Sequence, residues 1–290
     1  MHINEIPPSP CVISSDESGR LLTMARKLQS VIFLAMHKGG SSFLARDLAR
    51  AIDHQVSGHV SMNIGNQIDT GEHTYEDLAV PSMGSAVVRV YPAEFDQLVP
   101  ATPGEIGPFS NVKIVALQRD PRDAAISRYF SVAFSHTPPP TTNTDAFLKR
   151  RDELVDLGPD GGMLRMVKPT MDEFEHFHRI VDSRTDALLT SYETMITDYR
   201  GWLYEVGRFV GWTTPEQERI FAQTKDALEF PVVGDPGEHV RRITPGNWRR
   251  YDRPKIRQAF EEHGGELMTK CGYSWPLTKE QKLERKARRR

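Results

Sequence analysis

Short apolar runs alternate along the chain with segments whose apolar residues recur at helical spacing. The predicted strands are VIFLAM at 31–36, KIVALQR at 113–119 and DALLTSYE at 186–193. The first strand is followed by a glycine turn and by a segment with one apolar helix face. A helix is predicted to begin at Pro121, after the second strand, and another is predicted to end at Gly211, after the third strand. This alternation predicts a single α/β domain with a central, mostly parallel β-sheet flanked by helices.

Glycine, proline, serine and asparagine interrupt this pattern in three stretches, 57–85, 136–145 and 231–247, which predict loops of the kind that cover substrates. The first residues of the chain are polar and rich in proline, and the last thirteen carry seven basic and two acidic residues. The predicted organisation is an N-terminal arm at 1–24, a domain at 25–277 and a basic tail at 278–290.

The composition is that of a soluble globular protein. Of the 290 residues, 38% are hydrophobic and 26% are charged, which excludes collagen-like and wholly disordered chains. The net charge of −2 argues against a general attraction to nucleic acid or to a membrane. Two cysteines, Cys11 and Cys271, make no disulfide framework. Prolines occupy the N-terminus where a secretory signal needs an apolar stretch, so a cytoplasmic location is the expectation.

The turn after the first predicted strand carries the chemistry of anion binding. Its sequence is His37-Lys38-Gly39-Gly40-Ser41-Ser42. Two glycines let the backbone approach a ligand, and successive N–H groups at a helix N-terminus favour negative charge. The lysine precedes both glycines, unlike the G-x-x-x-x-G-K-[ST] loop of nucleoside triphosphatases. The turn therefore predicts a P-loop-like cradle for phosphate or sulfate; the alternative is an ordinary glycine turn with an exposed lysine.

The second predicted strand ends in RDPRDAAIS. Arg119 and Ser127 stand at the two ends of this segment, across the start of a helix, where an arginine fork and a hydroxyl suit a second phosphate. Arg122 and Asp123 are left free to pair locally, and the alternative reading of the whole segment is a surface ion-pair cluster. A late segment, VRRITPGNW, adds two adjacent arginines in a glycine-containing loop.

Together and in this order, these segments resemble the motifs of the cytosolic sulfotransferases, which use 3′-phosphoadenosine 5′-phosphosulfate (PAPS). HKGGSSF resembles that family's K-[SG]-G-[TS]-[TS]-[WF], RDPRDAAIS its R-[ND]-P-[KR]-D-x-x-x-S, and YETM at 192–195 its Y-E-[DT]-M. The late loop approximates R-K-G-x-x-G-D-W, with Ile243 in place of glycine and Asn247 in place of aspartate. The resemblance covers residues 28–275.

The resemblance implies transfer of a sulfuryl group from PAPS to a hydroxyl or amine of a small-molecule acceptor, with release of adenosine 3′,5′-bisphosphate. Lys38 is implied to stabilise the charge on the leaving phosphate. The implied nucleotide contacts are Lys38, Gly39, Gly40, Ser41 and Ser42 at the phosphosulfate, Phe43 and Tyr192 at the adenine, and Arg119, Ser127, Arg241 and Arg242 at the 3′-phosphate. The acceptor pocket is expected from 57–85, 136–165 and 231–247, which show no charged stripe and so favour a small molecule over an anionic polysaccharide.

The general base is left open by the resemblance. Many members carry a histidine at the strand end that corresponds to VVRVYPAEF, residues 87–95, and this stretch has none. The candidates are His59, Tyr91 and Glu94, whose structural alternatives are a loop histidine, a strand-end packing residue and a carboxylate at a helix start. His37 occupies a position from which side chains of the family normally point away from the ligand.

Two other functions stay open at the level of sequence. A phosphoryl transferase using ATP and magnesium needs a lysine after the glycines and an acidic residue at a strand end, and no clear instance of either is present. A catalytically silent nucleotide-binding protein fits the missing histidine. His176 and His178, two residues apart on a predicted helix at 171–182, point to nearly opposite sides and cannot share an ion, so no metal site is expected.

Overall fold

The computed structural model describes residues 13–15, 21–23, 29–62, 85–99, 109, 112–138, 144–228 and 244–276. A five-stranded sheet in the order β4-β5-β3-β6-β7 forms the centre of the molecule, and every neighbouring pair in it is parallel. Its strands are β3 (Ser30–Ala35), β4 (His59–Met62), β5 (Ser85–Val90), β6 (Val112–Gln118) and β7 (Ala187–Ser191). The predicted fold class is confirmed, and the carboxyl ends of all five strands meet at one edge.

Two further strands, β1 (Ile13–Ser15) and β2 (Leu21–Thr23), pair with each other as a separate antiparallel sheet. The helices are α1 (Ser41–Phe43), α2 (Ala49–Gln55), α4 (Pro92–Leu98), α5 (Pro121–Phe130), α6 (Thr144–Asp182), α7 (Tyr192–Thr197), α8 (Tyr199–Val210), α9 (Thr214–Thr224) and α10 (Pro254–Lys270). Short π-helical turns, Leu44–Leu48 and Ser131–Ser135, continue α1 and α5, and 3-10 turns span Lys225–Leu228 and Asn247–Tyr251. None of the described helices combines the length and the apolarity needed to cross a bilayer.

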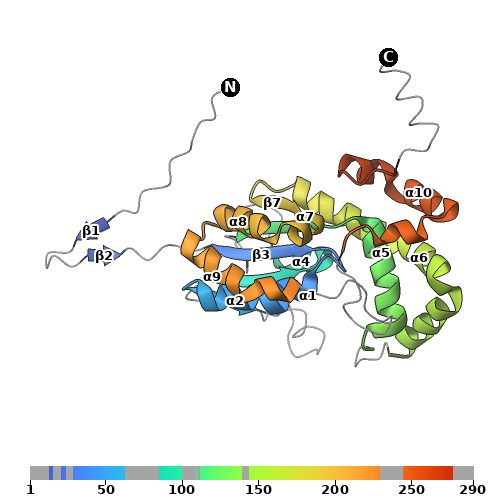
Figure 1. Cartoon of the computed structure of the whole chain (residues 1–290), viewed down its shortest axis with the longest axis horizontal. Coiled ribbons are helices and arrows are strands. Elements are labelled where there is room, and N and C mark those ends of the chain that lie inside the picture. Colours follow the sequence, from blue (N-terminus) through green and yellow to red (C-terminus); the bar gives the residue numbers. More distant parts are fainter. Residues whose placement is uncertain are drawn as a thin grey trace, which may run out of the picture.

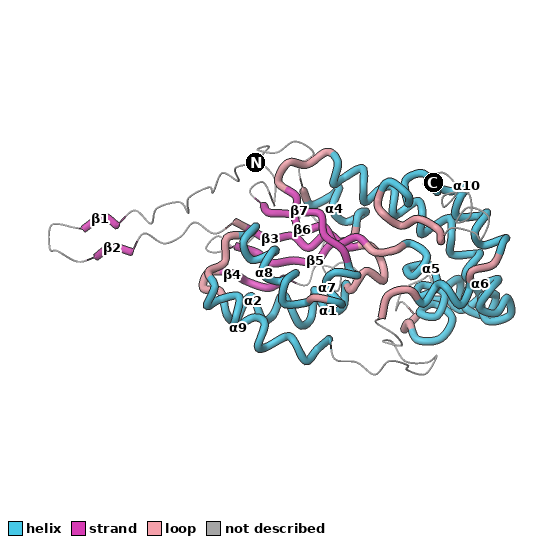
Figure 2. Tube along the Cα trace, turned by 45° about the horizontal axis from the view of Figure 1, so that its top comes forward, coloured by secondary structure: helices cyan, strands magenta, loops and turns pink. Residues whose placement is uncertain are grey.

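Alternate residues of the central strand β3 face two different hydrophobic cores. Ile32 and Leu34 pack with residues of α4, α5, α6 and α10, whereas Val31 and Phe33 pack with residues of α1, α2, α8 and α9. A strand buried on both faces is apolar without interruption, which is why the run at 31–36 predicted it. Figure 1 shows α5, α6 and α10 beyond the end of the sheet at which β3 leads into α1, and Figure 2 shows α2, α8 and α9 along one side of the sheet.

The predicted helix boundaries follow from capping. Asp120 caps α5, since its side chain accepts a hydrogen bond from the backbone N–H of Arg122, and Pro121 takes the first helical position. Gly211 ends α8 in the left-handed conformation, with φ of 84°. Both boundaries were predicted correctly.

Two predicted loops are in part regular structure. Strand β4 lies within 57–85, of which 63–84 falls outside the described residues, and the predicted acceptor segment 136–165 is helical from Thr144 onward. Gly158, with φ of 62° and ψ of −178°, interrupts α6 and divides it into two arms. Such a backbone conformation is essentially restricted to glycine. The basic tail at 278–290 and most of the N-terminal arm lie outside the described residues, so the predicted domain boundaries stay predictions.

Candidate active site

The turn between β3 and α1 is shaped by its two glycines. Lys38 and Gly40 both have positive φ, 66° and 87°. The N–H of Gly39 donates to the carbonyl of Met36 at 2.9 Å, and a Cβ on Gly39 would lie 2.9 Å from that same oxygen. A Cβ on Gly40 would lie 3.0 Å from Cε of Met195. The turn therefore leaves no room for side chains at the two positions, as a cradle for a close ligand requires.

Lys38 is a partly buried cation close to other cations. Its Nζ donates to Oγ of Ser131 at 3.2 Å. The pKa of Lys38 is lowered from 10.5 to about 8, mainly by burial and further by the charges of Arg119 and Arg128. Each of these causes disfavours the charged form, so a bound anion would stabilise the protonated lysine.

Arg119, at the end of β6, packs under the same turn. Its guanidinium donates to the carbonyl of Lys38 and lies 4.2 Å from the centre of the Tyr192 ring. The Tyr192 ring also packs against Gly40, where an added Cβ would lie 3.3 Å from it. Arg119 is 5% exposed, and its Nε has no hydrogen-bond partner among the described residues. A buried donor of this kind costs about 1–3 kcal/mol unless an acceptor reaches it.

The other residues predicted to contact the nucleotide differ in how exposed their side chains are. Ser41, Ser42 and Ser127 are partly exposed on α1 and α5. Phe43 is only 7% exposed, and its ring packs edge-on against Tyr199 with centroids 5.6 Å apart. Its core packing is thus observed, and its stacking on adenine stays a prediction. The predicted contacts at positions 241 and 242 lie outside the described residues.

Arg122 forms a local ion pair, as expected, but Asp123 is not its partner. Arg122 instead binds the Asp120 carboxylate through Nε at 2.8 Å and Nη2 at 2.7 Å. Its guanidinium also lies 3.8 Å from the ring of Trp248 and 4.7 Å from that of Trp275. This bidentate pair with two aromatic faces anchors the start of α5 to the C-terminal part of the chain.

Asp123 binds the backbone of the late loop. Its Oδ2 accepts the N–H of Gly246 at 2.5 Å, and its Oδ1 accepts the N–H of Trp248 at 2.8 Å. The carboxylate therefore fixes the end of the VRRITPGNW segment against the start of α5. Two motifs that are distant in sequence become one structural unit at this point.

A model of the sulfotransferase domain matches residues 28–272. This chain belongs to the sulfotransferase family. Human heparan sulfate glucosamine 3-O-sulfotransferase 3B1 is 27% identical over 209 residues, which is 71% of this chain and 51% of that protein, so the chain spans about half the length of this relative.

Solved structures of the family resemble this sulfotransferase at low identity. Mouse sulfotransferase SULT7A1 complexed with PAP is 18% identical with a TM-score of 0.46, and the match covers 83% of this chain and 84% of that one. Retinol dehydratase in a complex with retinol and PAP is 15% identical with a TM-score of 0.47, and the match covers 87% and 85%.

His59 lies far from the turn between β3 and α1. It begins β4 in register with Ser85, at the amino end of the sheet, whereas the turn lies at the carboxyl end. Its side chain is 4% exposed and its Nε2 accepts a hydrogen bond from Nε1 of Trp212 at 3.3 Å. The proposal of His59 as general base is therefore corrected, because a buried group at the opposite edge cannot reach the reacting atoms.

The other two candidates for the base differ in position. Glu94 caps α4, since its Oε2 accepts the N–H of Tyr91 at 2.7 Å, and it lies 3.5 Å from Nη1 of Arg89. Tyr91 reaches the cradle, and its hydroxyl donates to Oγ of Ser41 at 3.1 Å. The structure thus gives Glu94 a capping role and leaves Tyr91 beside the turn.

His37 and Glu173 form a pair that the motifs did not predict. Both the backbone N–H and Nδ1 of His37 lie 2.7 Å from Oε1 of Glu173. The His37 ring stacks on that of Tyr91 with centroids 3.8 Å apart and keeps 42% of its side chain exposed. Nη1 of Arg128 donates to the other carboxylate oxygen at 3.0 Å.

The charge state of Glu173 follows from these contacts. Burial alone would raise the pKa of this carboxyl, but the hydrogen bonds from His37 and the charge of Arg128 outweigh burial and hold the pKa below its ordinary 4.5. Glu173 is therefore ionised at neutral pH. The only sequence signal for this pair was the unusual histidine before Lys38, because Glu173 lies on the long helix at a separation of 136 residues.

The two histidines of α6 have different partners. Nε2 of His176 lies 2.7 Å from Oδ2 of Asp96, and Nε2 of His178 lies 3.3 Å from Sγ of Cys271. Across the described ranges, no three His, Cys, Asp or Glu side chains are arranged to hold a metal ion. Phe174 and Phe177 of the same helix are fully buried in the core.

Proposed function

We propose that this protein is a PAPS-dependent sulfotransferase that transfers a sulfuryl group to a hydroxyl or amine of its acceptor. Lys38 carries the proposal: a partly buried cation at a positive-φ turn, close to the charges of Arg119 and Arg128, is costly without an anionic partner. The family membership and the order of the motifs support the same reaction. The predicted cytoplasmic location and small-molecule acceptor stay predictions, and the human relative is named for heparan sulfate.

The residues around the turn fit the anionic parts of PAPS. Gly39 and Gly40 admit a phosphosulfate against the backbone, with Lys38, Ser41 and Ser42 as its polar contacts. The unpartnered Nε of Arg119 and the hydroxyl of Ser127 suit the 3′-phosphate, with positions 241 and 242 as further proposed contacts. When bound, PAPS supplies the sulfuryl group and a phosphate leaving group.

Lys38 would act on the leaving group. As the bond to sulfur breaks, negative charge grows on the bridging phosphate oxygen. A cation about 4 Å away is worth about 4 kcal/mol at an effective dielectric constant of about 20. Since this interaction strengthens as the charge develops, it lowers the barrier rather than merely tightening binding.

We further propose that His37 accepts the proton of the attacking group. Its ring is exposed beside Lys38, and Glu173 fixes its orientation and would stabilise the imidazolium that forms. Tyr91 supports the ring from one face and holds Ser41 through its hydroxyl. This arrangement supplies a base in place of the histidine that is missing at 87–95.

The test separates turnover from binding. With a hydroxyl or amine acceptor identified by screening and with PAPS at saturating concentration, Lys38→Ala should lower kcat more than about 100-fold, a loss that weaker nucleotide binding does not account for. His37→Asn should lower kcat on the same acceptor more than about 100-fold and leave bisphosphate binding unchanged, whereas His54→Asn, at an exposed histidine of α2, should leave both unchanged. Equal turnover in Lys38→Ala and the parent would contradict the assignment, and nucleotide binding without turnover on any acceptor would favour a silent binding protein.

A further inference from the structure

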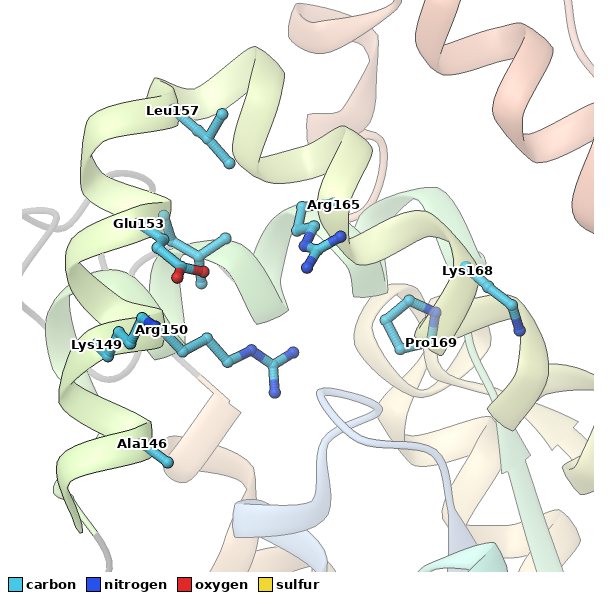
Figure 3. A pocket seen from close by; sticks show the side chains of 9 residues that line it. Ala146, Lys149, Arg150, Glu153, Leu157, Arg165, Lys168 and Pro169 are labelled. Carbon is cyan, nitrogen blue, oxygen red and sulfur yellow. The ribbon is translucent and has the colours of Figure 1, made fainter. Parts of the chain in front are cut away.

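The bend in α6 creates a cleft between the two arms of the helix. It has a volume of about 540 Å³ and lies between residues 144–157 and the arm that follows Gly158 (Figure 3). Four cationic side chains line it, Lys149 and Arg150 from the first arm and Arg165 and Lys168 from the second, against the one carboxylate of Glu153. The lining is therefore strongly positive in a chain whose overall charge is −2.

Arg150 and Arg165 face each other across this cleft. Figure 3 shows both guanidinium groups projecting from opposite arms into the space between them. The pKa of Arg150 is lowered by burial first and then by the charges of Arg128 and Arg165, and these causes outweigh the charge of Glu153, which raises it. Within the part of the chain that the structure describes, neither Arg150 nor Arg165 forms an ion pair, whereas Lys168 has Asp172 at 2.7 Å. Two arginines that face each other without an ion pair repel one another, and an anion between them would relieve this repulsion.

The cleft adjoins the proposed reaction centre through Arg128. Its Nη1 lies 3.4 Å from the carbonyl oxygen of Pro169, which lines the cleft, and 3.0 Å from Glu173, which holds His37. Pro169 and Glu173 are four residues apart and so lie one turn apart on the same helix. The charge of Arg128 acts both on Lys38 and on Arg150. A molecule held in the cleft is therefore next to the His37 side of the turn.

We propose that this cleft binds a carboxylate or sulfate group of an anionic acceptor and so selects the acceptor class, an inference that rests on the proposed sulfuryl transfer. Arginine forks suit such oxyanions because they donate two parallel hydrogen bonds. The volume is that of a small-ligand pocket and accommodates a charged sugar-sized group. The sequence shows no charged stripe in the expected acceptor segments, and the bend in α6 is what brings the four cations of the cleft together.

The test uses sucrose octasulfate as a polyanionic probe and sucrose as its neutral match. Calorimetric titrations are run with the full chain, with and without saturating adenosine 3′,5′-bisphosphate, which keeps the probe out of the phosphate cradle. The parent should bind the sulfated probe and not sucrose. Arg150→Gln/Arg165→Gln should weaken probe binding at least tenfold, whereas Arg179→Gln/Lys255→Gln, which removes two exposed charges outside the cleft, should change it less than twofold.

Each alternative outcome overturns a defined part of the account. No binding of the probe, equal weakening by both double variants, or displacement of the probe by the bisphosphate would contradict the cleft proposal. Binding of the bisphosphate is measured in the same variants and should be unchanged. If the parent binds no bisphosphate, the proposed function fails. Weaker probe binding by Arg150→Gln/Arg165→Gln than by the parent still decides whether the cleft is an anion site.

Discussion

The lowered pKa of Lys38 predicts a specific pH dependence of nucleotide binding. With a pKa of about 8 in the free protein, the protonated fraction of Lys38 is about 0.9 at pH 7 and about 0.1 at pH 9. The phosphates of the ligand are fully ionised above pH 7, since their second pKa is about 6. Binding of adenosine 3′,5′-bisphosphate that needs the ammonium group should therefore weaken about tenfold between pH 7 and pH 9.

The sign follows from the direction of the shift. The neutral lysine contributes no charge to binding, so affinity is full well below pH 8 and is lost as the pH rises through 8. The neutral form is negligible as a binder, because the charge is worth about 4 kcal/mol at about 4 Å, which corresponds to roughly a thousandfold in affinity. A tenfold loss corresponds to about 1.4 kcal/mol.

Isothermal titration calorimetry at pH 7, 8 and 9 measures this loss, and buffers of different ionisation enthalpy report uptake of about half a proton at pH 8. Lys38→Arg is the control, because the guanidinium stays charged throughout this range. Its affinity can differ from that of the parent at pH 7 but should then stay constant to pH 9. A parent as insensitive to pH as this variant, or a variant that weakens equally, would refute the role given to the Lys38 ammonium.

Two further substitutions test the frame of the site. Gly40→Ala places a Cβ on a residue with φ of 87°, 3.0 Å from Met195. Urea denaturation should show a free energy of unfolding lower by about 1–2 kcal/mol, and calorimetry should show weaker bisphosphate binding. Unchanged values of both would contradict the close packing at Gly40. Asp123→Ala leaves two backbone N–H groups, those of Gly246 and Trp248, without acceptors and should cost about 2–4 kcal/mol in urea denaturation, while Asp123→Asn should cost less. Equal stability of all three Asp123 proteins would show that the late loop is held by other contacts.

The parts of the fold that were predictable are those determined locally. β3 is buried on both faces and so is apolar throughout, and Gly40 and Gly211 stand at positive-φ positions that favour glycine. Lys38 and Arg119 follow the ends of β3 and β6, which are adjacent parallel strands, so their motifs meet at one edge of the sheet. The cradle could therefore be assembled from local patterns and the predicted sheet.

Contacts across long separations were not predictable from local patterns. Asp123 binds Gly246 at a separation of 123 residues, and the carboxylate of Glu173 reaches back to His37 from the long helix. A search limited to the sequence around each motif finds neither partner. His59 shows the opposite limitation of local patterns. It lies between two motifs in sequence, but the sequence does not indicate that it occupies the amino edge of the sheet, away from the cradle.

The cationic cleft was missed for a related reason. Its cations occupy two short sequence segments that look unremarkable separately, and only the bend at Gly158 brings Arg150 opposite Arg165. Gly158 and Pro159 disfavour a continuous helix here, but packing of α6 against α5 and α10 sustains a helix on both sides of the bend. Tertiary packing thus overrode the local propensity.

Selectivity for a nucleotide with a 3′-phosphate separates the proposed sulfotransferase from an ATP-dependent phosphoryl transferase. The purified protein is titrated calorimetrically with adenosine 3′,5′-bisphosphate and, in parallel, with ATP plus magnesium. The account predicts micromolar binding of the bisphosphate and no binding of ATP. Binding of ATP without binding of the bisphosphate would contradict the sulfotransferase assignment and favour a phosphoryl transferase.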